Sequence, residues 1–235
     1  MTITSIHNEK LKEIRKLTRQ RKARDRTGRF VAEGEDLLAA ADAAGWVAVE
    51  RLCATGSGLA GLEVDPELLA GASTLGSGTR TLAIYEERWA VEPAGPLCVY
   101  LHGVADPGNV GTVLRSAQAF GADSVVLGPG SADPFSPKAV RASMGAIFTT
   151  AVARVSDYAA LPGPTVALVA GQGPPLHSLG LTAATLLIGA EREGLPEELV
   201  AAADHVARIP IASHSLNAAM AATVALYEIT RIRPA

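Results

Sequence analysis

The sequence has 235 residues, 48% hydrophobic and 19% charged, a composition that fits a folded protein of one large or two small domains and excludes a disordered chain. It contains no apolar stretch near the ~20 residues of a transmembrane helix, and the polar start MTITSIHNEK argues against a signal peptide. The two cysteines, Cys53 and Cys98, lack CxxC spacing and the five histidines lack ligand spacing, so we expect a reducing cytoplasm and no metal site.

The net charge of −3 hides a strong asymmetry. Residues 1–29 hold ten of the 21 Lys and Arg but only three acidic residues, so this segment carries about +7 and the remainder about −10. A basic segment on an acidic body favours a polyanionic partner, RNA or DNA. The alternative is an ordinary solvated helix face.

The first part of the chain alternates predicted helices and short strands. Asn8 is placed to cap a helix from Glu9 to about Arg24, which Thr27-Gly28 ends. After it we expect the strands Phe30–Ala32, Trp46–Cys53 and Arg80–Tyr85 and the helix Glu35–Ala44. The run Glu92–Pro96 is rich in Pro and Gly, and we place a domain boundary between residues 94 and 95.

Beyond this linker, strand and helix patterns alternate regularly. The predicted strands are Leu97–Leu101, Ser124–Leu127, Thr165–Val169, Thr185–Ile188 and His205–Ile211. The predicted helices are Val110–Phe120, Pro137–Ser143, Pro196–Ala203 and Leu216–Ile232. Such alternation predicts an α/β fold, with a parallel sheet covered by helices on both faces.

The run Gly56–Gly61 matches the dinucleotide-binding pattern GxGxxG and follows a predicted strand. That pattern binds pyrophosphate only where a helix opens within it. Here Val64 is β-branched and Pro66 blocks a continuing helix. We therefore predict a flexible loop.

Three turns at predicted strand ends carry polar side chains. The first, Asp106–Asn109, places Asn109 at the mouth of a helix, with Arg115 within two turns and leaning back toward the turn. Ligands bind α/β folds at such strand ends. The alternative is an ordinary strand–turn–helix unit in which Asn109 is the N-cap and Arg115 a solvated charge.

The second turn lies in the run LLIGAEREGL, where Gly189 would let a ligand approach the backbone and Glu191 is a lone carboxylate. An ordinary turn leading to a helix at Pro196 explains the same residues.

The third turn follows Ile209-Pro210-Ile211, where Ser215 and Asn217 open an Ala-rich helix. N-cap chemistry alone would explain Ser215. A hydrolase built on Ser215 and His214 is not expected, because adjacent residues rarely face each other and the sequence has no GxSxG turn.

In this order, DPGNVGTVLRSAQAFG, LLIGAEREGL and IPIASHSLNAAMA resemble the three motifs of the SpoU (TrmH-type) branch of the SPOUT RNA methyltransferases. The run Pro137–Gly145 resembles the segment that this family carries between the first two motifs. The basic start and Phe30–Gly34 resemble its N-terminal RNA-binding domain, which is similar to a ribosomal protein. The resemblance covers essentially the whole chain and is weakest over residues 54–80.

This resemblance implies a C-terminal SPOUT domain, residues 95–235, whose mostly parallel sheet ends in a deep trefoil knot. It also implies a smaller α/β domain, residues 1–94, that binds the RNA substrate. The expected activity is transfer of a methyl group from S-adenosylmethionine to a ribose 2′-hydroxyl, in ribosomal rather than transfer RNA. The enzyme would act as a cytoplasmic homodimer with a shared active site, without a metal or a membrane.

The resemblance also assigns residues by their positions in the motifs. The catalytic group would comprise Asn109, Arg115, Glu191, Ser215 and Asn217. The cofactor would contact Gly189, Ile209 and Leu216. We expect RNA contacts from Lys16, Arg19, Arg21, Lys22, Arg24, Lys138 and Arg141.

The role of Arg115 is open at this point. In the family its equivalent is proposed as the base, yet an arginine stays protonated at ordinary pH and a phosphate favours its charged form. It could instead orient the phosphate and stabilise the developing oxyanion.

One departure concerns the third motif, in which only Ile211–His214 separate Pro210 from Ser215, fewer residues than the family usually has. Two other functions stay open. One is a catalytically silent RNA-binding module of the same fold, and the other is a nucleotide-dependent oxidoreductase that uses the GxGxxG run.

Overall fold

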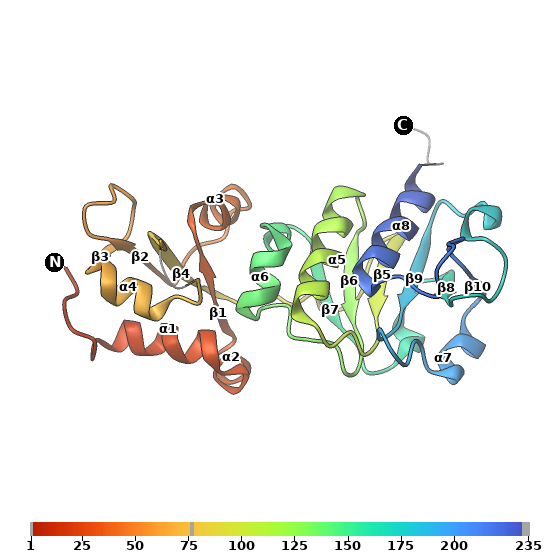
Figure 1. Ribbon diagram of the computed structural model, residues 1–235, viewed down its shortest axis with the longest axis horizontal. Coiled ribbons are helices and arrows are strands. Elements are labelled where there is room, and N and C mark those ends of the chain that lie inside the picture. The colour runs from red at the N-terminus through yellow and green to blue at the C-terminus, as the bar shows by residue number, and fades with distance from the viewer. Residues whose placement is uncertain (1, 76–77, 232–235) are drawn as a thin grey trace. The chain divides into compact units, whose positions relative to one another are not determined.

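The computed structural model describes residues 2–75 and 78–231, and contacts divide the chain into two compact units. The first comprises the chain up to Arg88 together with Asp133–Phe148, and the second comprises Trp89–Ala132 together with the chain from Thr149 onward. Figure 1 shows the elements of each unit. None of the described helices is long and apolar enough to cross a membrane.

The first unit is built on a four-stranded sheet with the order β1-β4-β2-β3. The strands are β1 (Arg29–Glu33), β2 (Glu50–Ala54), β3 (Leu62–Val64) and β4 (Thr81–Glu86). β4 runs antiparallel to both β1 and β2, and β3 is parallel to β2. The helices of this unit are α1 (Glu9–Arg19), α2 (Arg21–Thr27), α3 (Glu35–Ala43), α4 (Pro66–Ala72) and α6 (Pro137–Ser143), with a 3-10 helix at Ala146–Phe148.

Alternating strand residues give this sheet two different cores. The aliphatic side chains of α1, Leu11, Ile14 and Leu17, pack with Leu52, Leu82 and their neighbours. An aromatic cluster forms separately from Phe30, Trp46, Tyr85, Phe135 and Phe148, with ring centroids 4.9–6.3 Å apart. All five rings are buried, so these aromatic side chains belong to the core of the unit and do not face solvent.

The second unit is built on a six-stranded sheet with the order β10-β8-β9-β5-β6-β7, in which every pair is parallel. The strands are β5 (Leu97–Leu101), β6 (Ser124–Leu127), β7 (Ala151–Arg154), β8 (Thr165–Leu168), β9 (Ala184–Ile188) and β10 (His205–Ala207). The helices are α5 (Pro107–Ala119), α7 (Glu197–Ala202) and α8 (Ala218–Thr230), with 3-10 helices at Tyr158–Ala160 and Leu176–Leu179.

Helices cover both faces of this sheet. On one face α5 and α8 pack against each other (Figure 1). The Ser116 and Thr223 hydroxyls lie 2.6 Å apart between these two helices. On the other face, Leu199 of α7 is buried with Tyr100 and Leu187 of the sheet. The predicted α/β fold with a parallel sheet is therefore confirmed.

Several predicted elements differ in extent from those observed. The single helix predicted from Glu9 breaks at Gln20, whose extended backbone (φ −127°, ψ 110°) separates α1 from α2. As predicted, no helix opens within Gly56–Gly61 and continues through Pro66. Pro66 instead begins a separate helix, α4, because Asp65 caps it and proline is favoured in a first turn. The strand β10 ends at Ala207, before the predicted Ile211. The predicted end of the last helix, Ile232, lies outside the described residues.

The segment Asp133–Phe148 interrupts the second unit between β6 and β7 and packs within the first. Phe135 lies 4.9 Å from Phe30 between ring centroids, and the Trp46 indole N–H donates to the Phe148 carbonyl at 2.8 Å. This grouping differs from the predicted division at residues 94–95, which treated each domain as one continuous stretch.

Candidate active site

The carboxyl ends of β5 and β9 lie side by side because the two strands are parallel neighbours. The backbone N–H of His102, just beyond β5, donates to the carbonyl of Ile188 at 2.9 Å. The turn before α5 and the turn after β9 therefore emerge at the same edge of the sheet, where ligands bind in this class of fold.

The first turn is capped by Asp106 and not by Asn109. The Asp106 carboxylate accepts from the backbone N–H groups of Gly108 and Asn109, at 2.6 and 3.1 Å. Asn109 consequently lies inside the first turn of α5, where its side chain is available for other contacts. The interpretation of Asn109 as the helix N-cap is wrong.

The Asn109 side chain joins the three motifs. Its amide Nδ2 donates to Oε1 of Glu191, and its Oδ1 accepts from Nδ2 of Asn217 at 3.1 Å. These partners lie 82 and 108 residues away in the sequence. Three of the predicted catalytic residues thus form one hydrogen-bonded row.

The direction of this row is fixed by the cap of α8. Asn217 is the N-cap, and its Oδ1 accepts from the N–H groups of Ala219 and Met220 at 2.9 and 3.3 Å. Only Nδ2 of Asn217 is then left to donate to Asn109, whose own Nδ2 must face the carboxylate of Glu191. Since Asn217 caps the helix, N-cap chemistry does not explain Ser215.

Gly189 serves the fold of its own turn. A Cβ atom at this position would lie 2.2 Å from the carbonyl carbon of Gly194, well inside contact distance. Ala190 and Gly194 exchange two backbone hydrogen bonds, 3.1 and 2.9 Å long, which hold the turn against Gly189. The glycine is needed because the chain itself approaches closely, so the fold of the turn explains Gly189 without a ligand.

This turn forms one wall of a cavity of about 290 Å³. The three predicted cofactor residues, Gly189, Ile209 and Leu216, all line it, and so do Glu191 and Ser215. Its apolar wall consists mainly of Leu168, Val169, Ile188, Leu195, Ile209, Ile211 and Leu216. The structure therefore brings five of the eight predicted catalytic and cofactor residues to one cavity, next to the hydrogen-bonded row.

Arg115 stands apart from these residues. It lies in the middle of α5 with its side chain exposed. Within the part of the chain that the structure describes, no hydrogen bond or ion pair links Arg115 to Asn109, Glu191 or Asn217. The expected meeting of Asn109 and Arg115 at one pocket is not seen in this single chain.

Sequence reasoning missed other residues of the cavity, among them Glu193 and the end of β8, Leu168–Ala170. Because β8 is the parallel neighbour of β9, its carboxyl end reaches the same edge. The signal that could have found these residues is strand adjacency, which the sequence does not contain.

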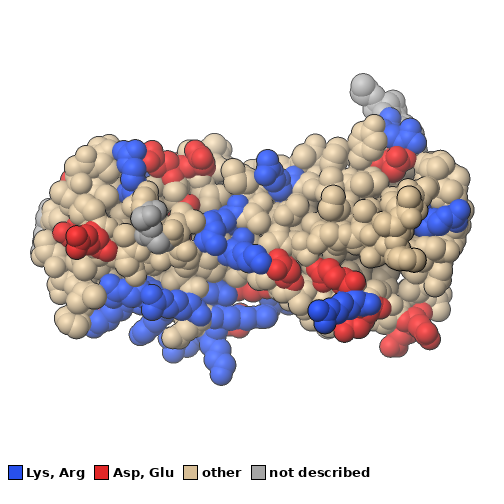
Figure 2. Space-filling model, in the orientation of Figure 1, with Lys and Arg blue, Asp and Glu red and all other residues tan. Residues whose placement is uncertain are grey.

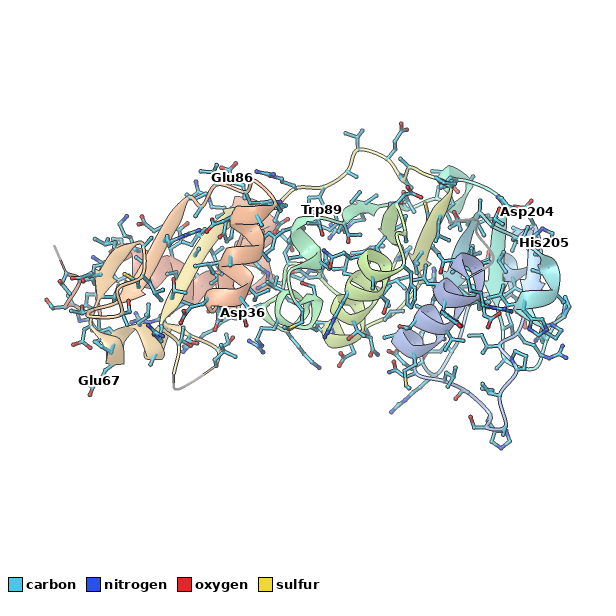
Figure 3. All side chains as sticks on the ribbon, turned by 90° about the horizontal axis from the view of Figure 1, so that it is seen from above. Asp36, Glu67, Glu86, Trp89, Asp204 and His205 are labelled. Carbon is cyan, nitrogen blue, oxygen red and sulfur yellow. The ribbon has the colours of Figure 1, made fainter. Side chains whose placement is uncertain are left out.

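The sheet edge where β10 begins holds a separate polar cluster. Figure 3 labels Asp204 and His205 there. The Asp204 carboxylate accepts from the Thr165 backbone N–H at 2.8 Å and hydroxyl at 2.9 Å, and these bonds lower the pKa of Asp204. This cluster joins the starts of β8 and β10, so we assign it a structural role.

The predicted RNA-contacting residues fall into three groups. Figure 2 shows Lys and Arg gathered along α1 and α2, where Lys16, Arg19 and Lys22 are exposed. Arg21 is also exposed and pairs with Asp25 at 3.6 Å. On α6, Lys138 is exposed and Arg141 donates to the Thr74 hydroxyl at 2.5 Å.

Arg24 forms the third group, because it is buried. Its Nε and Nη2 lie 2.8 and 2.7 Å from Oδ2 of Asp133, and its Nη1 donates to the Leu17 carbonyl at 2.6 Å. A guanidinium held in this way is not available to RNA. The expectation that Arg24 contacts RNA is therefore wrong, and its role is to hold the end of α1.

Comparison with known proteins identifies the family. The SpoU rRNA Methylase family matches residues 96–227, and the MRM3-like substrate binding domain matches residues 8–84. The chain belongs to the SpoU rRNA methylase family. Residues 96–227 contain the complete row of Asn109, Glu191 and Asn217 and the whole cavity.

Curated SpoU relatives match over different lengths. The 23S rRNA (guanosine(2553)-2′-O)-methyltransferase RlmP of Bacillus subtilis is 26% identical over 97% of this chain and 98% of its own length. The 23S rRNA (uridine(2479)-2′-O)-methyltransferase of Streptomyces viridochromogenes is 36% identical over 54% of this chain, and that match spans half of its length.

Solved structures of the family match nearly the whole chain. An AdoMet-bound rRNA methyltransferase from Sinorhizobium meliloti has a TM-score of 0.87 and 33% identity, covering 98% of this chain and 97% of its own. The SpoU methyltransferase AviRb from Streptomyces viridochromogenes, in complex with AdoMet, has a TM-score of 0.84 and 27% identity, covering 96% of this chain and 98% of its own. The similarity therefore includes both units.

Proposed function

We propose that this protein transfers the methyl group of S-adenosylmethionine to a ribose 2′-hydroxyl of ribosomal RNA. Residues 95–235 carry the transfer and residues 1–94 bind the RNA. The observation that carries this proposal is the hydrogen-bonded row of Asn109, Glu191 and Asn217 beside the cavity. A polar row next to a mostly apolar cavity suits a reaction in which a bound cofactor meets a polar substrate.

The cavity suits S-adenosylmethionine in shape and charge. Aliphatic side chains such as Leu168 and Ile209 offer an apolar wall for the adenine ring. The cavity is also lined by the carboxylates of Glu191 and Glu193 and the guanidinium of Arg192, so its lining carries a net charge of about −1 and favours a cofactor with a net positive charge. The backbone near Gly189, Ile209 and Leu216 would hold the cofactor. When bound, it supplies an activated methyl group on a sulfonium ion, so the chemistry needs no metal.

The protein's own residues must position the ribose and assist the 2′-hydroxyl in losing its proton. Asn109 presents an amide whose direction is set by Asn217, so it can orient a hydroxyl beside Glu191. Ser215 adds a hydroxyl at the same cavity. Arg115 stays protonated, so we assign it to the substrate phosphate and to the oxyanion that develops as the proton leaves.

The exposure of Arg115 away from the row is consistent with a site completed by a second copy of the chain. α8 exposes Met220 (59%) and Tyr227 (52%), large apolar side chains that a homodimer interface would cover. Its alanines Ala218, Ala222 and Ala225 are buried within the chain, so close helix approach is already used there. Light scattering at micromolar concentration should give twice the 24.2 kDa chain mass. A monomer would contradict this assignment.

The proposed function also bears on where in the cell the protein works. An enzyme that modifies ribosomal RNA works where ribosomes are assembled, and the two buried free cysteines, Cys53 and Cys98, suit a reducing compartment. We therefore place the protein in the cytoplasm. The trefoil knot implied by the family resemblance stays a prediction.

The test of the proposed function is methyl transfer by Arg115 variants. Arg115→Ala should abolish tritium transfer from labelled S-adenosylmethionine to ribosomal RNA while leaving cofactor binding, measured by calorimetry, near wild type. Arg115→Lys should also fail, since one ammonium does not replace a planar fork that holds phosphate and hydroxyl together. Normal transfer by Arg115→Ala would contradict the assigned role, and absence of cofactor binding by the wild type would contradict the function itself.

A further inference from the structure

The first unit presents a basic face on α1 and α2. Arg21 is exposed there and pairs with Asp25, and the other exposed cations of the two helices are Lys16, Arg19, Lys22 and Arg26. None of these four has an ion pair within 4.0 Å in the described part of the chain. Unpaired surface cations suit phosphate groups, because binding a phosphate then breaks no internal pair. We call these four residues the basic face.

The basic face is held in a fixed shape. Arg24 lies between its members in sequence but is buried, and it ties the Leu17 carbonyl at the end of α1 to Asp133. Gln20 gives the break between the two helices a defined geometry, with its N–H donating to the Lys16 carbonyl at 2.9 Å. A surface fixed in advance loses little entropy on binding a ligand that is itself rigid.

The same unit offers unpaired bases no aromatic platform. All its Phe, Trp and Tyr side chains lie within the described residues and are at most 7% exposed: Phe30, Trp46, Tyr85, Phe135 and Phe148. Sequence-tolerant binding of single strands relies on stacking bases on exposed aromatic rings. The basic face therefore has the charge needed for RNA without the rings that single-strand binding uses.

We propose that the basic face binds the phosphate backbone of base-paired RNA, and that it does not bind unpaired nucleotides. This inference rests on the proposed function only in taking RNA as the partner. A duplex presents its phosphates at fixed spacing to the exposed cations of the two helices, and its bases are already stacked on each other. The unit then anchors the enzyme on a helical region and leaves the choice of nucleotide to other contacts.

The experiment compares two labelled RNAs with equal numbers of phosphates, a hairpin with a long stem and an unstructured single strand. Binding to the full chain is followed by fluorescence polarisation without cofactor. Counterion release per phosphate is larger for a duplex, with slopes near −0.9 against −0.7, so four contacts at 0.1 M salt favour the hairpin by about sixfold from this effect alone. Binding of the single strand as tightly as the hairpin would overturn the proposal.

A charge-matched pair of variants localises the effect. Arg19→Glu with Lys22→Glu should remove the preference for the hairpin. The control, Arg51→Glu with Arg80→Glu, changes two cations of the same unit that already pair with Asp42 and Glu35, and it should keep the preference. Loss of preference in the control, or its retention in the first variant, would overturn the assignment to α1 and α2.

Failure of the base-paired RNA inference and failure of the proposed methyl transfer give different experimental results. Calorimetric binding of S-adenosylmethionine and methyl transfer to ribosomal RNA do not depend on which RNA form the basic face prefers. A chain that transfers methyl groups but binds both RNAs equally would overturn this inference alone. A chain that prefers the hairpin but binds no cofactor would overturn the proposed function alone.

Discussion

Removal of Asp133 tests whether Arg24 is structural. The side chains of Asp133 and Arg24 are only 8% and 6% exposed. Among the described residues, the Arg24 guanidinium forms hydrogen bonds and ion pairs only with Asp133 and the Leu17 carbonyl. In Asp133→Ala the guanidinium would stay buried without its counter-charge. Breaking a buried pair on one side costs about 3–5 kcal/mol of unfolding free energy, and we expect a loss of this size.

The double variant Arg24→Met, Asp133→Leu separates burial of a charge from loss of packing. Replacing both partners by apolar side chains of similar size leaves no buried charge and is often close to neutral in stability. We therefore expect part of the loss in Asp133→Ala to be recovered. The rest remains because the Phe135 N–H and the Leu17 carbonyl lose their partners in the double variant. Urea denaturation followed by tryptophan fluorescence measures both, because Trp46 lies in the aromatic cluster next to Phe135 in the same unit.

Two results would refute this reasoning. A loss below about 1 kcal/mol in Asp133→Ala would show that the pair behaves as an exposed one. A flatter salt dependence of RNA binding in the double variant would show that Arg24 contacts phosphate after all, since each lost contact reduces the slope by about 0.7–0.9.

Three further changes test the second unit. Gly189→Ala forces a Cβ against Gly194, so we expect about 1–3 kcal/mol of destabilisation and loss of cofactor binding by calorimetry; wild-type affinity would contradict this. Asn217→Ser keeps a helix cap but removes the amide donor to Asn109. The free energy of unfolding should therefore change by less than about 1 kcal/mol, while the rate of methyl transfer falls. A fall in transfer that only matches a loss of stability would make Asn217 a cap and nothing more. Hydrogen bonds from Thr165 lower the pKa of Asp204 in the folded protein. The ionised Asp204 therefore stabilises the fold fully above its pKa in the unfolded chain, and this stabilisation is lost as the pH falls through its lower pKa in the folded protein. The gap in melting temperature between wild type and Asp204→Ala should therefore close below about pH 4, and a constant gap would refute this.

The sequence predicts the second unit well because its signals are local. β5 and β6 have the predicted bounds, since each is a short apolar run with a clear stop. The strand β7 (Ala151–Arg154) escapes prediction because it lies at the edge of the sheet, where only its two middle residues are buried and no continuous apolar run marks it. The position of β10 beside β8 also has no local signal, as it depends on how the chain crosses the sheet.

The first unit was harder to predict because tertiary contacts decide its elements. Beside the helix break at Gln20, Arg24 contacts both the Leu17 carbonyl and Asp133, and Asp133 lies 109 residues from Arg24. For the same reason a charge count placed Arg24 among the RNA contacts. Counting charges shows that a segment is basic, but only burial tells which of its cations face solvent.

In the active site, the motifs identified side chains but not their partners. The sequence offers Asn109 and Ser215 as candidate helix caps, yet the true caps are Asp106 and Asn217. This difference matters chemically, because the oxygen of a side chain that caps a helix accepts hydrogen bonds from backbone N–H groups and is not available to other donors. Asp106 leaves Asn109 free, and Asn217 keeps only its amide donor for other contacts. The two caps thus give the row toward Glu191 its direction, so the helix starts that hold the fold also orient the group proposed to meet the ribose.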